Sequence, residues 1–464
     1  MRKIKWILVL AIILIAVPTY AHQVKSGKKI HKLQFEDIET LIMERNPTIQ
    51  INKNMRKNLN DNKNDIEDAI EDAEDDKEDL EDAIDQMDET IGELNQKIKE
   101  LEVLKNSLDY ENDKPEGNST NGDVNSMDDG SDTDLGSKYN NLYKALEGTI
   151  IKVQELYQSN IMTLTQNKRA MRDQLEDFDK EIDKLPNQKI ELDKTILQLE
   201  MVNESTVWGA QNLYLGYTNL QRQRDELAQN LELLDDQIDI MNIQQELGMV
   251  TPLEVSGIEN QREQMVISLE TLETQMDNIK GELNLMLGQD FDTPLKLEDE
   301  LDIDEEIVSD MDYEDDLELA KKNSYSLELK TYDYRIQDNN EEWADDYGNY
   351  GDYRVAERNS ENATIELDQE RKNVELAFHK AYEEVHNKIT ALENEKRNLE
   401  YQQQKYDALK LRYELEMISK IEWKQGKAEY DSQKNKVETA QQDLLQAWLQ
   451  YEAFVEGMNF QQQQ

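Results

Sequence analysis

The chain contains no cysteine among its 464 residues. This absence excludes disulfide bonds, thiolate metal sites, cysteine nucleophiles and attachment of a lipid through cysteine. Prolines and phenylalanines are few, with six of each. A chain that is poor in these residues and rich in Glu, Gln, Leu, Lys, Asn and Asp favours long helices over a thick globular core. We therefore expect its stability to come from helix packing alone.

Basic residues are also scarce. The chain contains 52 basic and 102 acidic residues, which gives a formal net charge of -50. Nucleic acid is excluded as a partner, since binding it requires a basic surface that displaces phosphate counterions. A bare anionic lipid surface is equally unattractive to such a chain. So many carboxylates repel one another unless salt screens them. The composition is compatible with a generic solvating surface, and it favours a halophilic source.

The first 21 residues read as a secretory signal peptide. Arg2, Lys3 and Lys5 precede an apolar run of 12 residues, and the sequence Thr19-Tyr20-Ala21 supplies a cleavage site. The run is shorter than the roughly 18 residues that a spanning helix needs. We expect an exported protein whose mature chain begins at His22, with an uncleaved anchor as the alternative.

A nine-residue motif occurs twice. LGMVTPLEV, at 247–255, returns as LEMISKIEW, at 415–423. In each copy a hydroxyl precedes a glutamate by three residues, which predicts a capping box and the start of a helix. Each predicted helix then runs to a glycine, Gly288 or Gly457. The sequence therefore predicts a duplicated helical hairpin.

The start of each hairpin recurs as well. FEDIETLIMERNPTIQ, from Phe35, is similar to YEDDLELAKKNSYSLEL, from Tyr313. We place repeat one at 33–288, a linker at 289–312 and repeat two at 313–457. About 200 residues separate the opening asparagine from the turn in repeat one and about 90 in repeat two, so repeat one carries an insertion. The predicted fold is all-α, with elongated antiparallel coiled-coil helices in two internal repeats and little or no β-structure.

The insertion reads as an acidic coiled coil. Its apolar residues follow a 4,3 spacing broken only by Lys77, and 61–91 holds sixteen acidic and two basic side chains. A polar stretch, 110–137, reads as a disordered linker. Helical periodicity then resumes, so we expect 61–108 and 138–185 to form an antiparallel hairpin. The predicted seam residues are Ile66, Ile70, Ala73, Leu80, Ile84, Met87, Ile91, Leu94, Ile98 and Leu101 in the first helix, and Leu142, Leu146, Ile150, Val153, Tyr157, Ile161 and Leu164 in the second.

Together, the Asn46-Pro47 helix start, the two turn motifs, the sequence LMLG at 285–288 and the duplication resemble the TolC-like outer membrane efflux protein family. The resemblance implies three chains around a hollow helical tunnel, that is, a homotrimer. It also implies that each repeat adds two strands to an outer-membrane β-barrel, and that the hairpin tips dock an adaptor (membrane fusion) protein of an inner-membrane transporter.

By this resemblance the partner-binding residues lie at the hairpin tips. Glu416 stands where repeat one has Gly248, and its bulk and charge should hinder a close approach at the second tip. The same residues would cap helices and fill a hairpin end whatever binds there. The expected tip residues are Leu247, Gly248, Met249, Val250 and Thr251 in repeat one and Leu415, Met417, Ile418 and Ser419 in repeat two.

The chain departs from the family where the family has its spanning strands. The interval 345–359 of repeat two is too short for two strands of roughly 9 to 11 residues each, although 347–355 could form one short extended piece. In repeat one the acidic coiled coil occupies this place, and no bilayer core would accept its charge. We therefore expect a barrel-less relative, exported to the cell envelope or the medium.

Other chemistry finds little support in the sequence. His379 and His386 lie seven residues apart, not the four of a zinc-binding helix. The stretch DVNSMDDGSDTDLG does not align with a calcium loop. Tyr347, Tyr350 and Tyr353 could form a recognition patch, but packing against neighbouring helices is favoured. We expect a protein with no cofactor, no metal and no enzymatic activity.

Two functions therefore remain open. The first is an efflux or export component, a passive helical duct or scaffold that docks a transporter adaptor through its tips. The second is an extracellular coiled-coil structural protein or envelope spacer with no transport role. A duct needs a closed ring with a polar interior, whereas a spacer can be a single chain with a dry apolar seam.

Overall fold

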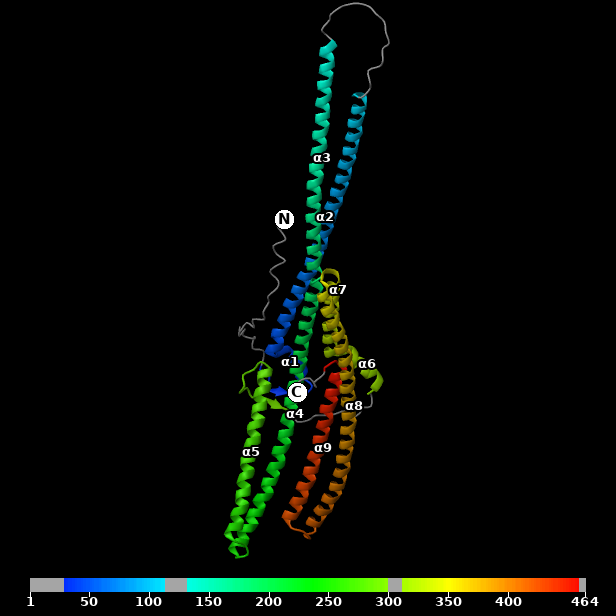
Figure 1. The fold of residues 1–464 in the computed structure, drawn as a ribbon. Helices are drawn as coiled ribbons and strands as arrows, with labels where there is room; N and C mark the ends of the chain where they lie inside the picture. Colours follow the sequence, from blue (N-terminus) through cyan, green and yellow to red (C-terminus); the bar gives the residue numbers. More distant parts are fainter. Residues whose placement is uncertain (1–28, 113–131, 299–310, 459–464) are drawn as a thin grey trace, which may run out of the picture. The chain divides into compact units, whose positions relative to one another are not determined.

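The structure, a computed structural model, describes residues 29–112, 132–298 and 311–458 (Figure 1). Within these ranges it contains nine helices, most of them long, and one pair of two-residue strands. The predicted all-α class is confirmed. The predicted signal peptide, 1–21, lies outside the described residues.

The chain divides into two compact units. Unit 1 combines the chain up to Leu59 with 193–337 and with the part from Arg358 onward. Unit 2 consists of 60–192 and 338–357. Unit 1 contains both copies of the nine-residue motif, and unit 2 contains the insertion.

The first half of unit 1 is built on α1 (Ile38–Arg45), α5 (Pro252–Met286) and the part of α4 (Leu185–Glu246) that begins at Asp193. Its core joins the opening helix to the base of the α4–α5 hairpin through buried Ile38, Ile42, Tyr214, Leu283 and Leu287. Two short strands, β1 (Lys32–Leu33) and β2 (Lys296–Leu297), pair in parallel beside this core.

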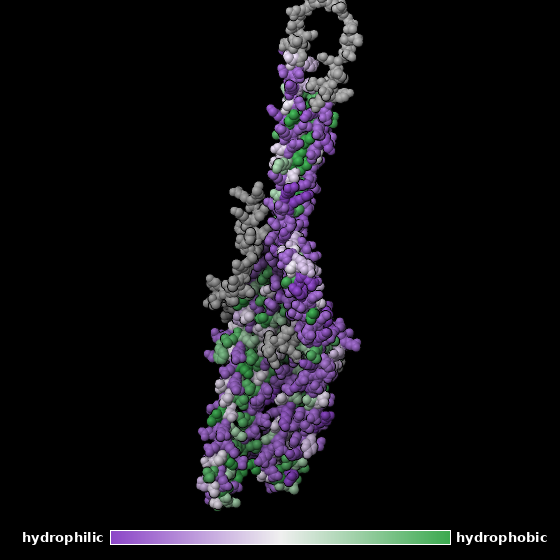
Figure 2. All heavy atoms as spheres, in the orientation of Figure 1, coloured by the Kyte–Doolittle hydropathy of each residue, from purple (hydrophilic) through white to green (hydrophobic). Residues whose placement is uncertain are grey.

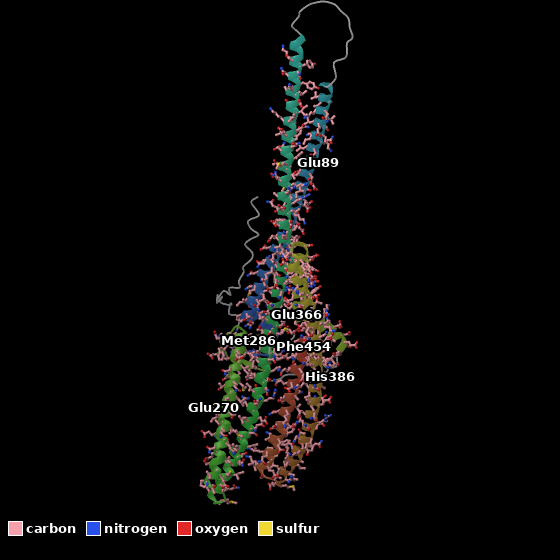
Figure 3. The ribbon with its side chains drawn as sticks, in the orientation of Figure 1. Glu89, Glu270, Met286, Glu366, His386 and Phe454 are labelled. Atoms are coloured by element: carbon pink, nitrogen blue, oxygen red, sulfur yellow. The ribbon has the colours of Figure 1, made fainter. Side chains whose placement is uncertain are left out.

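The second half of unit 1 repeats this plan. Its opening helix is α6 (Tyr313–Asn323), and its hairpin consists of α8 (Tyr350–Glu414), which belongs to unit 1 from Arg358, and α9 (Lys420–Val455). Buried Ala320, Phe378, Leu444, Tyr451 and Phe454 form the core. The Tyr451 hydroxyl donates to Asp316 Oδ2 at 2.5 Å and so ties α9 to α6. Figure 3 shows Met286 and Phe454 at the base of their hairpins, opposite the turns that join α4 to α5 and α8 to α9.

The same joint closes each hairpin. The Asn46 side chain donates to the Met286 carbonyl at 3.0 Å, and the Asn323 side chain donates to the Val455 carbonyl at 2.9 Å. A glycine with positive φ follows two residues after each accepting carbonyl, at +67° for Gly288 and +108° for Gly457. Each glycine faces a carbonyl oxygen from the end of the opening helix. The two-repeat boundaries stay a prediction, which these matching contacts support.

Unit 2 contains an antiparallel hairpin formed by α3 (Asp132–Ile182) and the part of α2 (Pro47–Asn112) that begins at Asn60. Lys168 pairs with Asp88, and Lys77 pairs with Asp179 at 2.9 Å. Partners that lie later in α2 thus meet residues that lie earlier in α3, as an antiparallel pair requires. Lys77 interrupts the apolar seam, and its ion pair explains how the seam accommodates a charge.

Two expectations for the insertion were wrong. Leu142 and Leu146 are 67% and 46% exposed, because Tyr143 is the residue turned toward α2, where its hydroxyl donates to the Leu108 carbonyl. The stretch 110–137 is not wholly a linker either, since α2 continues to Asn112 and α3 already begins at Asp132. The part between them, 113–131, lies outside the described residues.

The interval 345–359 contains a turn between two helices, not an extended piece. Two residues, Gly348 and Asn349, separate the end of α7 (Tyr325–Tyr347) from the start of α8. The Asn349 side chain accepts from the backbone N–H of Gly351 at 2.9 Å and so caps the new helix. The Tyr347 hydroxyl donates to Asp183 at 2.8 Å, whereas Tyr350 is 80% exposed. Tyr347 therefore packs against a neighbouring segment, as favoured, whereas Tyr350 lies open to solvent.

In the described parts of the chain, no helix combines the length and the apolar character that crossing a bilayer requires.

Candidate docking site at the hairpin tips

The first tip is the turn between α4 and α5. Helix α4 ends in a Schellman motif, in which Met249 N–H donates to the Gln244 carbonyl at 2.8 Å and Gly248 N–H donates to the Gln245 carbonyl at 2.9 Å. Gly248 has a φ of +73°, the left-handed conformation that this motif needs. The glycine therefore shapes the turn itself.

The second tip, between α8 and α9, has the same hydrogen bonds. Met417 N–H donates to the Arg412 carbonyl and Glu416 N–H donates to the Tyr413 carbonyl, both at 2.9 Å. Glu416 has a φ of +57°, the one non-glycine residue with positive φ in the described ranges. A left-handed conformation costs a residue with a Cβ about 1–2 kcal/mol. Glutamate at this position is thus tolerated without any change in the path of the turn.

Each tip is followed by a capped helix. Thr251 and Glu254 form the full capping box: Glu254 N–H donates to Thr251 Oγ1 at 3.3 Å, and Thr251 N–H donates to Glu254 Oε2 at 2.7 Å. The backbone N–H and the hydroxyl of Thr251 both donate to the Glu254 carboxylate, and these two hydrogen bonds lower the pKa of Glu254. At the second tip, Glu422 N–H donates to Ser419 Oγ at 3.2 Å. The predicted capping box is therefore complete at the first tip, whereas the second tip has only its hydroxyl cap.

The tips present apolar side chains to solvent. Leu247 and Met249 are each 70% exposed at the first tip, and Leu415 and Met417 are 61% and 65% exposed at the second. Val250 and Ile418 are half-buried. Leu253, which is not among the expected tip residues, is 82% exposed. Its position in the first turn of α5, next to the capping residue, is the signal that could have identified it.

Packing beneath each tip holds its shape. Val255 is buried one turn below the first tip. Below the second tip, the rings of Tyr413 and Trp423 stack at 5.1 Å with an interplanar angle of 12°, and Tyr406 stacks on Tyr430 in the same way. Stacked aromatic pairs of this kind stabilise a hairpin beyond the area that they bury. The exposed methionines are thus displayed on preformed ends.

One lysine joins the two hairpins near their tips. The Lys424 ammonium donates to Glu232 at 2.8 Å and to Asp236 at 2.5 Å, and its side chain is only 17% exposed. Its hydrogen bonds raise the pKa of Lys424, and the hydrogen bond from Lys424 lowers the pKa of Asp236. Both directions mean that the charged pair is stabilised.

The chemistry of the tips is that of a contact surface. They combine exposed Leu and Met side chains, backbone groups already used in caps, and carboxylates. Among the described residues, no group of three or more His, Asp or Glu side chains is arranged to hold a metal ion. His379 and His386 lie on α8, where each makes an edge contact with a tyrosine, Tyr313 or Tyr382.

No protein-family model matches the chain, and no curated protein sequence matches it. Several solved structures match part of the chain. The outer membrane channel CmeC of Campylobacter jejuni is 11% identical, with 60% of this chain and 68% of that one covered and a TM-score of 0.49. For a membrane protein from Pseudomonas aeruginosa the identity is 11%, the coverage 60% and 71%, and the TM-score 0.47. For the outer membrane protein VceC from Vibrio cholerae the corresponding values are 11%, 60%, 76% and 0.42.

Proposed function

We propose that the chain is an exported, non-enzymatic component of an efflux or export system in the cell envelope. Its two hairpins form part of a duct or scaffold, and their tips dock the adaptor protein of an inner-membrane transporter. The observation that carries this proposal is the matched pair of tips, Leu247 with Met249 and Leu415 with Met417. Both pairs stand exposed on turns with the same hydrogen bonds.

The physical argument starts from the exposure of these side chains. Single exposed apolar residues are common on soluble monomers and indicate no function. A preformed cluster of exposed apolar side chains with a polar rim, by contrast, marks an interaction site. Methionine suits such a site because its flexible thioether adapts to an apolar groove. Since the two tips differ only modestly, a partner with repeated coiled-coil hairpins could bind both in the same manner.

The resemblance of the sequence motifs to the TolC-like family supports the choice of partner. In that family the corresponding turns dock an adaptor, and an assembly of three chains encloses the tunnel. The homotrimer and the adaptor are thus part of the proposal. An envelope spacer is the second candidate, and it requires no exposed methionine at either tip.

Co-purification from native envelopes tests this function. Methionine truncation at the centre of an interface weakens binding roughly tenfold per residue when the side chain is well packed. We therefore expect the wild-type chain to retain an adaptor, identified by mass spectrometry, and the Met249→Asp, Met417→Asp double variant to lose it. Met162, 64% exposed on α3 in unit 2, supplies the matched control Met162→Asp, which should retain the adaptor.

The circular dichroism spectrum and the unfolding midpoint of the double variant should match those of the wild type. If a folded double variant retained the adaptor, the tips would not be the docking site. Wild-type envelopes that yield no transporter adaptor at all would favour the spacer.

A further inference from the structure

A break interrupts the helical path from α3 into α4. Two residues, Asp183 and Lys184, separate the two helices. Lys184 N–H donates to the Glu181 carbonyl at 3.3 Å, three residues back instead of four, which leaves the Lys180 carbonyl without its helical donor. Pro186 has no N–H to continue the ladder of helical hydrogen bonds. This α3–α4 break is therefore a point at which the chain can bend.

The end of α7 contacts the α3 side of the break (Figure 1). The Trp343 indole N–H donates to the freed Lys180 carbonyl at 3.2 Å, and the Tyr347 hydroxyl donates to Asp183 at 2.8 Å. This hydrogen bond to Asp183 raises the pKa of Tyr347 to about 12, so the phenol keeps its proton. The Lys184 nitrogen lies 5.0 Å from the centre of the Trp343 ring, a cation–π contact. Each of the two aromatic residues thus holds the break through a hydrogen bond.

The same helix contacts the α4 side of the break. Asn187, in the first turn of α4, accepts from the Asn339 side chain at 2.8 Å and donates to the Asn340 side chain at 2.9 Å. All of these residues belong to unit 2. Purple and pale spheres predominate around the end of α7 in Figure 2, so no broad apolar surface faces solvent there. Polar contacts and two rings therefore connect α7 to both sides of the break.

Side chains do not fill all of the space between the break and α7. A cavity of about 180 Å³ remains there, lined by Asp183, Pro186, Asn339, Glu342, Trp343 and Asp346. Three of these six residues are carboxylates, and no described basic side chain lines the cavity. A moving joint needs such room, because closely packed side chains would resist any change in the bend.

Charges of the same sign oppose this contact. The segment 341–347 of α7 holds four acidic residues and no basic one, and the segment 176–184 around the break holds five acidic and two basic residues. Lys77 of α2, which pairs with Asp179 at 2.9 Å, reduces the acidic excess but does not reverse it. Hydrogen bonds and ring contacts therefore hold together two segments that their net charges push apart. Salt weakens such repulsion.

We propose that the α3–α4 break is a hinge, that the end of α7 clamps it, and that ionic strength decides how often the clamp is closed. At about 1 M salt the screening length is roughly 3 Å, so the hydrogen bonds prevail and the clamp closes. At about 0.01 M salt the screening length is roughly 30 Å, and the repulsion opens the clamp. Helix α2 limits the movement, because Lys77 holds α3 before the break and Glu67 pairs with Lys189 of α4 after it.

Distances between spin labels in the full-length chain test this proposal. The chain has no cysteine of its own. Gln174→Cys on α3 and Tyr350→Cys at the start of α8 therefore place two nitroxides at exposed, uncharged positions of unit 2. Double electron–electron resonance then reports how far the end of α7 lies from α3. We expect one narrow distance at about 1 M salt, and a longer distance whose share rises at least about threefold at about 0.01 M salt.

Two pairs of substitutions separate the repulsion from the clamp. Glu342→Gln with Asp346→Asn removes two of the opposing carboxylates, and it should preserve the short distance at low salt. Trp343→Leu with Tyr347→Phe removes the hydrogen bonds of the two rings, and it should give the longer distance even at high salt. Trp343→Phe alone keeps a ring but loses the N–H donor, so its share of the longer distance should lie between those of the wild type and the double variant.

Glu259→Gln with Glu263→Gln is the matched control for charge. It removes two exposed carboxylates with the same spacing on α5, in unit 1, and it should leave the distances as in the wild type. A carboxylate variant of α7 that behaves like this control would overturn the proposed role of ionic strength. So would a wild-type distance that does not change with salt, or a wild type that loses its helical circular dichroism before the longer distance appears.

The hinge itself is decided at high salt. If Trp343→Leu with Tyr347→Phe stays helical and keeps the wild-type distance there, the break is rigid without the clamp and the proposal is wrong. These outcomes do not depend on whether the tips dock an adaptor, because the labels and the clamp lie in unit 2 and the tips lie in unit 1.

Discussion

At the scale of single residues, two glycines decide how each hairpin closes on its opening helix. A Cβ added to Gly288 would lie 3.0 Å from the Arg45 carbonyl oxygen, and one added to Gly457 would overlap the Asn323 carbonyl oxygen. Both glycines also have left-handed backbones, but the φ of +108° at Gly457 lies beyond the region that other residues occupy with modest strain. Gly457 is therefore the less replaceable of the two.

Replacement of Gly457 by alanine should destabilise the protein by about 2–4 kcal/mol, because backbone strain and steric overlap act together. Gly288→Ala should destabilise it by about 1–2 kcal/mol. The measurement is the urea-unfolding midpoint followed by circular dichroism. Gly209→Ala is the control, since Gly209 lies within α4 with no atom in reach of a new Cβ, and it should gain about 0.5–1 kcal/mol. A Gly457→Ala protein as stable as wild type would mean that this joint is not rigid.

At the scale of helices, the capping box at Thr251 fixes where α5 begins. Three hydrogen bonds that involve a side chain link Thr251 with Glu254, whereas Ser419 and Glu422 share one. Removing an N-terminal cap releases the first turn of a helix while its remaining turns stay packed. The effect of a cap substitution should therefore be local to the tip.

Thr251→Ala should cost the first turn of α5 about 1 kcal/mol, which corresponds to roughly fivefold faster hydrogen exchange there. Exchange measured by mass spectrometry on peptides covering 250–258 would report it. Thr274→Ala is matched in chemistry and helix, because the Thr274 hydroxyl donates to the Glu270 carbonyl at 2.9 Å in the exposed interior of α5. That control should exchange no faster than wild type. Unchanged exchange at the tip of Thr251→Ala would show that packing alone holds the turn.

Local patterns made most of these elements predictable. Seam positions such as Ile66, Ala73 and Ile84 follow from a 4,3 spacing, and they are buried as predicted. Leu142 and Leu146 did not obey the same spacing, because the register of the facing helix places Tyr143 toward α2. The contacts between the two hairpins could not be predicted from local sequence patterns either. Lys424 and Asp236 are 188 residues apart in the chain, and only the tertiary structure brings them together. At the tips, turn and cap chemistry predicted the backbone, and the place of Leu253 in the first turn of α5 could have indicated its exposure as well.

At the scale of the whole molecule, unpaired carboxylates oppose folding. Burial raises the pKa of Glu204 on α4, and the neighbouring charges of Glu39, Glu456 and Glu200 raise it further. Burial and Glu39 raise the pKa of Glu456 in the same way. These carboxyl groups bind protons more readily in the folded chain than in the unfolded one. Their ionisation therefore reduces stability, in addition to the general self-repulsion of a chain with net charge -50.

The unfolding midpoint should therefore rise as the pH is lowered from 7 toward the ordinary glutamate pKa of 4.5. The increase begins as the pH falls through the raised pKa values. At about 1 M salt the screening length is roughly 3 Å, and long-range repulsion between carboxylates contributes little. The change of the unfolding midpoint with pH that remains then reports on carboxylates that lie close together. Glu204→Gln should flatten this slope and raise the midpoint at pH 7. Glu263→Gln, an exposed substitution on α5, should do neither. A midpoint that falls steadily between pH 7 and 5 would contradict the argument.

The parallel pairing of β1 with β2 brings Lys32 beside Lys296, although more than half of the chain separates them in sequence. The Tyr214 hydroxyl reinforces this connection by donating to the Glu298 carbonyl at 2.6 Å. A backbone cut anywhere in 113–131 would consequently leave β1 and α2 on one fragment and β2 on the other, held together by the strands, by the core around Ile38 and by the α2–α3 seam. The gene could therefore be divided at this point, and the two polypeptides, produced separately, should reconstitute one particle.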